Sequence, residues 1–170
     1  MSDAVRIFVG CDPNDCDLEQ MLVLDASLRR RTSLPLDITF MRLSRDPGSP
    51  WFSDPDAGHG WNTARWPTPF SGLRWGIPAA CGGKGRALYL DADILCLADI
   101  AALWRMEIPP GRAMLAAGEG RRLRLGTMLL DNAAMARHLP PIEALRRDPR
   151  AHEAAKALFE KRGDLVGPLP

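Results

Sequence analysis

Short apolar runs recur along the chain, each bounded by turn-forming residues. The run VRIFVG, residues 5–10, is β-branched and aromatic and is followed by CDPND, so it predicts a buried strand ending near Val9. LDITFMRL, residues 36–43, predicts a second strand that is too apolar for a surface ribbon, and we expect both strands inside the sheet. The later strands predicted in the same way are RALYL (86–90), AMLAAG (113–118) and GTMLLDN (126–132).

A helix is predicted between the first two strands. Apolar residues spaced three or four apart give a stripe, Asp17 and Gln20 have the spacing of a capping box, and arginines 29–31 suit a helix C-terminus. ADIAALW, residues 98–104, predicts a second, short helix. The alternation of strands and helices favours an α/β fold with a mostly parallel sheet covered by helices.

Residues 44–69 have no period and are crowded with Pro, Gly, Asp and Trp. An irregular stretch of this length inside a domain is usually functional or disordered, and its three tryptophans argue against disorder. Trp51, Trp61 and Trp66 could stack on a ligand or anchor the segment to the core, and both interpretations stay open.

A helix is predicted after this segment. Thr68 suits its cap and Pro69 its first position, while Phe70, Leu73, Ile77 and Ala80 fall on one face and Pro78 should kink or split it. The tail, residues 133–170, predicts two or three polar helices whose thin stripe of Ala154, Ala157 and Leu158 should pack weakly. We expect one domain over residues 1–170, with 133–170 as its helical tail.

Composition narrows the classes of partner. The 22 basic and 21 acidic residues nearly cancel, which argues against bulk attraction to nucleic acid or to an anionic membrane. The four cysteines form no C-x-x-C pair, so a zinc cluster is not expected. Without a signal-peptide pattern or an apolar run of about 20 residues, we expect a cytoplasmic protein with no transmembrane segment; peripheral contact with the inner face of a membrane stays open.

Two aspartates, Asp91 and Asp93, follow the apolar run RALYL. In an open parallel sheet the carboxyl ends of the strands collect ligands, and Asp12 follows the first strand at the same edge. In an extended chain, residues two apart point to one side, so both carboxylates could hold one Mg²⁺ or Mn²⁺ and leave places for phosphate oxygens. The pair could instead cap the next helix.

The segments TPFSGLRWGIP and LYLDADILCLADIAALW together resemble glycosyltransferase family 8, the retaining enzymes that include glycogenin and lipopolysaccharide galactosyltransferases. A basic aromatic-rich helix, a strand, Asp-x-Asp and an I-x-x-L-[WF] helix follow one another in the order typical of that family. The resemblance spans about Val5 to Asn132 and implies a glycosyltransferase A-type, Rossmann-like fold. It also implies transfer of a hexosyl group from a UDP-sugar, or another nucleotide diphosphate sugar, to a hydroxyl of a glycan, lipid-linked or protein acceptor.

The resemblance assigns roles to particular residues. Asp91 and Asp93 match the family's metal-binding pair, which holds Mn²⁺ (or Mg²⁺) against the donor diphosphate, and Ala92 between them belongs to the donor site. VGCDPN resembles the segment that cradles the nucleoside, so Asp12 and Asn14 would contact base and ribose, although Asp12 could equally form an Asx-turn before Pro13. Arg74 matches a basic residue that binds the donor diphosphate. Nearby Lys84 and Arg86 are interpreted as surface charge.

The sequence departs from the family at its end. The H-x-x-G-x-x-K-P-W segment that completes the metal site is not found, and His138 and His152 are expected at the surface. Arg124 stands where a donor-contacting Asn is common. A catalytically silent nucleotide-binding or regulatory module on the same fold is therefore an alternative. A phosphohydrolase of the haloacid dehalogenase type, with Asp91 as nucleophile, is a second.

Overall fold

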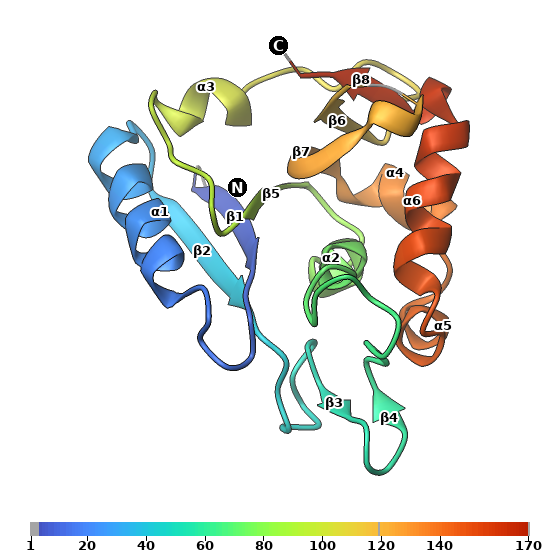
Figure 1. Cartoon of the computed structure of the whole chain (residues 1–170). Coiled ribbons are helices and arrows are strands. Elements are labelled where there is room, and N and C mark those ends of the chain that lie inside the picture. The colour runs from blue at the N-terminus through green and yellow to red at the C-terminus, as the bar shows by residue number, and fades with distance from the viewer. Residues whose placement is uncertain (1–3, 119, 170) are drawn as a thin grey trace.

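A six-stranded sheet forms the centre of the molecule (Figure 1). The computed structural model describes residues 4–118 and 120–169. Among the described strands of this six-stranded sheet, only β7 runs antiparallel to its neighbours; the pairs β1–β2, β1–β5 and β6–β8 are parallel, as expected for a mostly parallel sheet. In spatial order the strands are β2 (Leu36–Met41), β1 (Val5–Gly10), β5 (Arg86–Asp91), β7 (Arg124–Asp131), β6 (Met114–Ala117) and β8 (Val166–Pro168).

The prediction of an interior position was right for β1 and wrong for β2, which lies at the edge of the sheet. The side chains of Leu36, Ile38 and Phe40 are accordingly only half-buried. Apolar composition alone does not distinguish an edge strand from a central one when one face of the edge strand is still covered by a helix.

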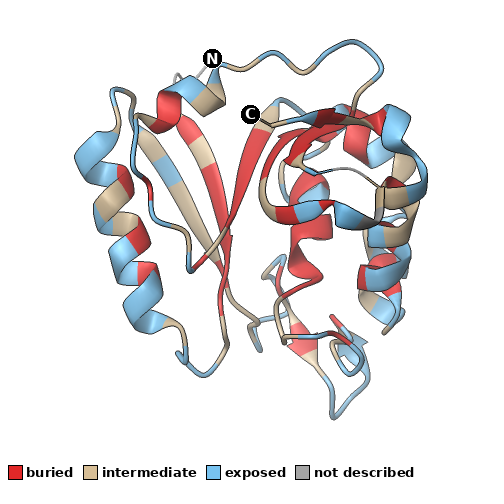
Figure 2. Cartoon of the chain, turned by 45° about the horizontal axis from the view of Figure 1, so that its top comes forward, coloured by how far each residue is buried: buried red, intermediate tan, exposed pale blue. Residues whose placement is uncertain are grey.

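One face of the sheet is aliphatic and is covered by α1 (Leu18–Arg31) and α3 (Ile100–Trp104). Met21, Leu24 and Leu28 of α1 are buried against this face, and Figure 2 shows the resulting stripe of buried positions along α1. The strand residues that alternate toward it are Val5, Ile7, Val9, Leu88, Leu90, Leu115 and Leu129.

The other face is aromatic. It packs against η1 (Leu73–Gly76), α2 (Ile77–Ala80), α4 (Asn132–His138), α5 (Ile142–Arg147) and α6 (Ala151–Lys161). Trp51, Trp61 and Trp66 are only 6%, 1% and 9% exposed, and Trp61 donates a hydrogen bond to the Pro50 carbonyl at 2.9 Å. These tryptophans therefore anchor the irregular segment to the core.

The irregular segment also contains a small hairpin, β3 (Ser53–Asp54) and β4 (His59–Gly60). The helix predicted from Pro69 begins only at Leu73, because Thr68 and Ser71 close a tight turn: the Ser71 amide donates to the Thr68 carbonyl at 3.2 Å. A 3₁₀ turn then leads into α2, with Pro78 in its first turn, where a missing amide donor is harmless. The split at Pro78 was expected; the late start was not.

The tail packs more firmly than its sequence predicts. Its buried residues on α6 are Ala151, His152, Ala155 and Phe159, one position away from the predicted stripe. Phe159 stacks on Trp75, with ring centroids 5.6 Å apart and planes at 12°. The remaining elements are η2 (Gly120–Arg122) and η3 (Gly163–Leu165), the latter leading into the unpredicted strand β8. No helix within residues 4–118 and 120–169 is long and apolar enough to cross a bilayer.

Candidate functional site

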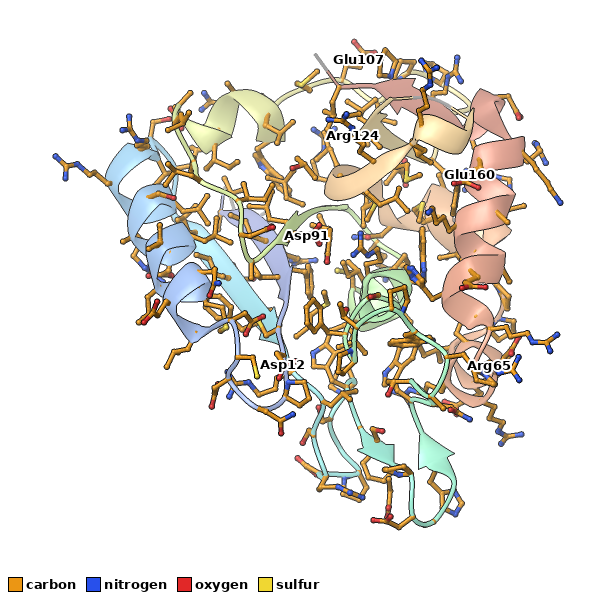
Figure 3. The ribbon with its side chains drawn as sticks, viewed as in Figure 1. Asp12, Arg65, Asp91, Glu107, Arg124 and Glu160 are labelled. Atoms are coloured by element: carbon orange, nitrogen blue, oxygen red, sulfur yellow. The ribbon has the colours of Figure 1, made fainter. Side chains whose placement is uncertain are left out.

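The side chain of Asp91 is held by two donors at the carboxyl end of β5. Its Oδ1 accepts a hydrogen bond from the Tyr89 hydroxyl at 2.6 Å and another from Arg74 Nη2 at 3.2 Å. Residues 89 and 91 lie two positions apart on the strand, so both side chains project to the same, aromatic face. Figure 3 shows Asp91 near the centre of the molecule, between β5 and the segment that carries η1 and α2.

Arg74 is fixed by the protein at each of its nitrogens. Nε donates to the Ser71 carbonyl at 2.8 Å and Nη1 to the Leu125 carbonyl at 2.5 Å, and the guanidinium lies 4.3 Å from the centre of the Tyr89 ring. The residue is 8% exposed. Since charge-assisted bonds in this geometry are strong, Arg74 here orients Asp91; the predicted direct contact with a donor diphosphate stays a prediction.

Tyr89 is a donor that the sequence reading missed. Burial raises the pKa of its hydroxyl far above the ordinary value; the Arg74 charge lowers this pKa and the Asp91 carboxylate raises it. The hydroxyl therefore stays protonated and donates a hydrogen bond to Asp91. The signal was available: this is the only tyrosine in the sequence, placed two residues before Asp91 in a predicted strand.

A glycine on β7 leaves room for the second oxygen of Asp91. Leu90 pairs with Thr127, which brings the start of β7 beside the end of β5. A Cβ on Gly126 would lie 2.6 Å from Asp91 Oδ2. No described residue donates a hydrogen bond to that oxygen, and the Asp91 side chain is 35% exposed. Oδ2 is thus free to meet a ligand.

Asp93 is exposed and Ala92 is buried in the aliphatic core. The chain turns directly after β5, and the Ile94 amide donates to the Asp91 carbonyl at 3.2 Å. Because residues 92 and 93 are in a turn, the extended-chain argument for bringing the two carboxylates to one side does not hold here. Among the described residues, no three His, Cys, Asp or Glu side chains gather as a metal site.

Asp12 follows β1, as predicted, and forms the Asx-turn that the sequence left open. Its Oδ1 accepts from the Asn14 amide at 2.7 Å, and its own amide donates to Asp17 Oδ2 at 2.9 Å. Asp17 therefore holds the loop, and the predicted capping hydrogen bond is not made. In Figure 3, Asp12 lies below Asp91, at the end of β1.

Pro13 and the exposed Asn14 border a cavity of about 670 Å³, which is otherwise lined mainly by residues 43–45 and 53–64. The wall of this hairpin cavity carries the polar side chains of Arg45, Asp54 and Asn62. Of the two predicted nucleoside contacts, Asn14 therefore adjoins a space large enough for a ring system, whereas Asp12 does not line it.

A larger cavity, about 1170 Å³, lies at the amino-terminal ends of the parallel strands, between Arg6, Asp37 and Arg86. These residues begin their strands, so this cavity is remote from Asp91. Arg86 donates to the carbonyls of Trp104 at 2.8 Å and Met106 at 3.1 Å, so its interpretation as surface charge was wrong. Lys84 is exposed, as interpreted.

The two tail histidines differ. His138, the last residue of α4, is half-buried, whereas His152 is 7% exposed, so the prediction of a surface position was wrong for His152. Trp75 Nε1 donates to His152 Nδ1 at 3.1 Å. Burial, together with the charges of Arg74 and Lys156, lowers the pKa of His152 to about 4, so it is neutral near pH 7. Arg124 is exposed at the start of β7.

The fold is that of a glycosyltransferase A-type domain, and its similarity to solved glycosyltransferases is structural. The bifunctional glycosyltransferase WbbM superposes with a TM-score of 0.66 at 13% identity, over 100% of this chain and 39% of that one. The glycosyltransferase GlyE of Streptococcus pneumoniae TIGR4 gives 0.62 at 18% identity, over 99% and 46%. The galactosyltransferase LgtC, solved with donor and acceptor sugar analogues, gives 0.61 at 15% identity, over 96% and 73%.

This chain therefore spans less than half the length of WbbM and GlyE. No protein-family model matches the sequence, and no curated protein sequence matches it significantly. At these identities the likeness establishes the fold.

Proposed function

We propose that the chain binds a nucleotide diphosphate sugar, with UDP as the nucleotide, and transfers its glycosyl group to an acceptor hydroxyl. The observation that carries the proposal is Asp91: a carboxylate at the carboxyl end of a central strand, fixed through Oδ1 and open at Oδ2 beside Gly126. A buried arginine and a buried tyrosine committed to one carboxylate indicate a positioned ligand group. The glycosyltransferase A-type fold supports this interpretation.

The donor set at this edge suits Mn²⁺ or Mg²⁺. Hard cations of this kind prefer carboxylate oxygens, and one or two carboxylates suffice when phosphate oxygens complete the coordination. Asp91 Oδ2 and the exposed Asp93 carboxylate are the residues that would hold the ion. Bound there, it would stabilise negative charge on the departing diphosphate.

The chain's own residues then have separate tasks. Tyr89 and Arg74 keep Asp91 oriented through two hydrogen bonds to Oδ1, which spares the site from ordering that carboxylate when the donor binds. The turn closed by Asp12 presents Asn14 beside the hairpin cavity, where a nucleoside would lie. We propose retention at the anomeric carbon, in line with the family that the sequence resembles.

A transfer assay tests this function. The chain is incubated with Mn²⁺, a panel of UDP-hexoses and simple glycoside acceptors, and UDP release and product formation are measured. Asp91→Asn should lower the rate on the order of 100-fold, since a fixed charge at the reacting centre is lost. Asp164→Asn, which removes only an exposed ion pair with Arg162, is the matched control and should leave the rate unchanged.

Two other outcomes of the assay are informative. A product whose anomeric configuration differs from that of the donor would contradict retention. UDP binding without transfer to any acceptor would favour the silent nucleotide-binding module on the same fold.

A further inference from the structure

The strand β2 leaves one side of its backbone without a partner. It is the last strand of the sheet, and no other described strand pairs with its outer side; α1 lies beside it at the left of Figure 1. The Pro35 and Met41 carbonyls accept from the amides of Val5 and Cys11 on the β1 side. Backbone groups alternate along a strand, so the N–H and C=O groups of Leu36, Ile38 and Phe40 point outward.

An unpaired edge of this kind normally carries a device that blocks pairing, such as a proline, a bulge or inward-pointing charges. β2 has none of these among its outward-pointing residues, whose side chains are all apolar. They lie half-buried at the margin of the aliphatic core. The edge is therefore competent to pair with another strand.

The flank of α1 above this edge is also apolar. On its other flank, α1 contacts the loop after β5: Ser27 accepts from the Cys96 amide at 3.1 Å, and Arg31 donates to the Leu97 carbonyl at 3.0 Å. Since β5 lies on the far side of β1 from β2, the opposite flank of α1 overhangs the β2 edge. Leu18 and Leu22, one turn apart on that opposite flank, are 45% and 62% exposed.

We propose that this edge and flank bind a second copy of the chain in a twofold-symmetric dimer. An antiparallel β2–β2 pair centred on Ile38 places Ile38 opposite Ile38 and Leu36 opposite Phe40 of the other copy. These are hydrogen-bonded pairs, so every outward N–H and C=O of the three residues finds a partner. The alternation sets Asp37 opposite Thr39 and so avoids apposing two aspartates.

Charge on the α1 flank suits a copy of itself better than an anionic partner. Asp25 and Arg29, which continue the line of Leu18 and Leu22, form an ion pair at 2.7 Å and leave no net charge there. A nucleic acid or an anionic membrane would find no basic excess on this flank. A twofold axis through Ile38 brings the two α1 flanks together over the joined sheets, which is the self-complementary arrangement of symmetric dimers.

Sedimentation velocity between about 1 and 100 µM tests the proposal on the full chain. The wild type should form dimers in this range, as expected of paired edges with an apolar flank. Leu22→Lys should weaken dimerisation about tenfold or more, because each dimer buries this side chain twice. Val23→Lys is the matched control: Val23 is 55% exposed on the same helix but faces away from the β2 edge, so its effect should be small.

Ile38→Pro tests the contribution of the β2 edge to dimerisation independently of the α1 flank. It removes an outward amide that the folded chain does not use, so the chain should fold, as judged by circular dichroism, and should be monomeric. Hydrogen exchange of residues 36–41 in the wild type should slow as the concentration rises. A monomer at 100 µM, or a dimer that is unaffected by both Leu22→Lys and Ile38→Pro, would overturn the proposal.

Discussion

The two faces of the sheet are built from different chemistry. The face under α1 and α3 is aliphatic, with Val, Ile and Leu side chains that form no hydrogen bonds. The opposite face holds four tryptophans and Tyr89, together with the buried polar side chains of Arg74 and His152. The aliphatic face stabilises the fold, whereas the aromatic face both stabilises it and positions Asp91.

This difference follows from the donors and acceptors available on each side. A half-buried carboxylate needs hydrogen bonds, and a buried arginine needs several acceptors, so both require a polar lining. The tight turn before η1 supplies part of it through the backbone carbonyl of Ser71, which a regular helix would use internally. Substitutions on the two faces should therefore have different consequences.

The largest expected effect comes from Trp75→Ala, which should lower the free energy of unfolding by about 3–5 kcal/mol. It removes the stacking on Phe159 and the donor to His152, and it loosens η1, which carries Arg74. Urea denaturation measures the loss. Leu24→Ala, on the aliphatic face, should cost about 2–5 kcal/mol yet leave UDP affinity unchanged, whereas Trp75→Ala should weaken it. Equal effects of the two substitutions on UDP affinity would contradict the proposed difference between the two faces.

The second effect is a pH dependence confined to the aromatic face. The pKa of His152 is lowered to about 4 by burial and by the charges of Arg74 and Lys156, against an ordinary value near 6.5. The unfolded chain therefore binds a proton that the fold excludes: the stability is fully present above pH ~6.5 and falls as the pH drops toward 4.

Between pH 7.5 and 4.5, His152 should thus contribute a loss of about 2 kcal/mol in the free energy of unfolding. Denaturation curves at both pH values give the size of this loss. His152→Gln does not titrate, so its loss over the same range should be smaller by about that amount. Identical losses in the two proteins would show that His152 titrates normally in the fold.

A smaller effect is expected at Gly126, where alanine should move Asp91 without unfolding the chain. The added Cβ would lie 2.6 Å from Asp91 Oδ2, the end of a side chain that can rotate away. Nucleotide affinity measured with Mn²⁺ should fall by about tenfold, because the open oxygen is displaced, with little change in stability. Gly163→Ala meets no atom within 4 Å and is the control. Unaltered nucleotide affinity in Gly126→Ala would indicate that Asp91 Oδ2 does not contact the ligand.

The smallest expected effect is that of Tyr89→Phe, which removes one hydrogen bond to Asp91 and keeps the ring under Arg74. Stability should fall by about 1 kcal/mol and nucleotide affinity by a few-fold, since Arg74 still holds Oδ1. Calorimetry and urea denaturation measure the two quantities. A loss of affinity as large as that of Asp91→Asn would indicate that the hydroxyl itself contacts the ligand.

The aliphatic face could be predicted from the sequence because its periodicities are regular. The stripe of α1 and the apolar runs at residues 5–10 and 86–90 placed one helix and two strands closely. The position of β2 at the edge could not be predicted, since order within a sheet depends on long-range pairing that local pattern does not record.

The aromatic face could be predicted only in part. Asp91 was predicted from its place after an apolar strand and Arg74 through the resemblance of its segment to a family, and the structure brings them together. Tyr89, Gly126 and His152 were missed as contributors. Their roles arise from contacts between segments far apart in the chain, such as β7 beside β5 and α6 against Trp75.

The most direct test of the central claim, that Asp91 and its neighbours form a metal-assisted donor site, is calorimetric titration of UDP into the chain with and without Mn²⁺. The wild type should bind UDP more tightly with Mn²⁺, and the Asp91→Asn, Asp93→Asn double variant should lose this dependence. No binding of UDP by the wild type under either condition, or equal Mn²⁺-dependent binding by the double variant, would contradict the claim.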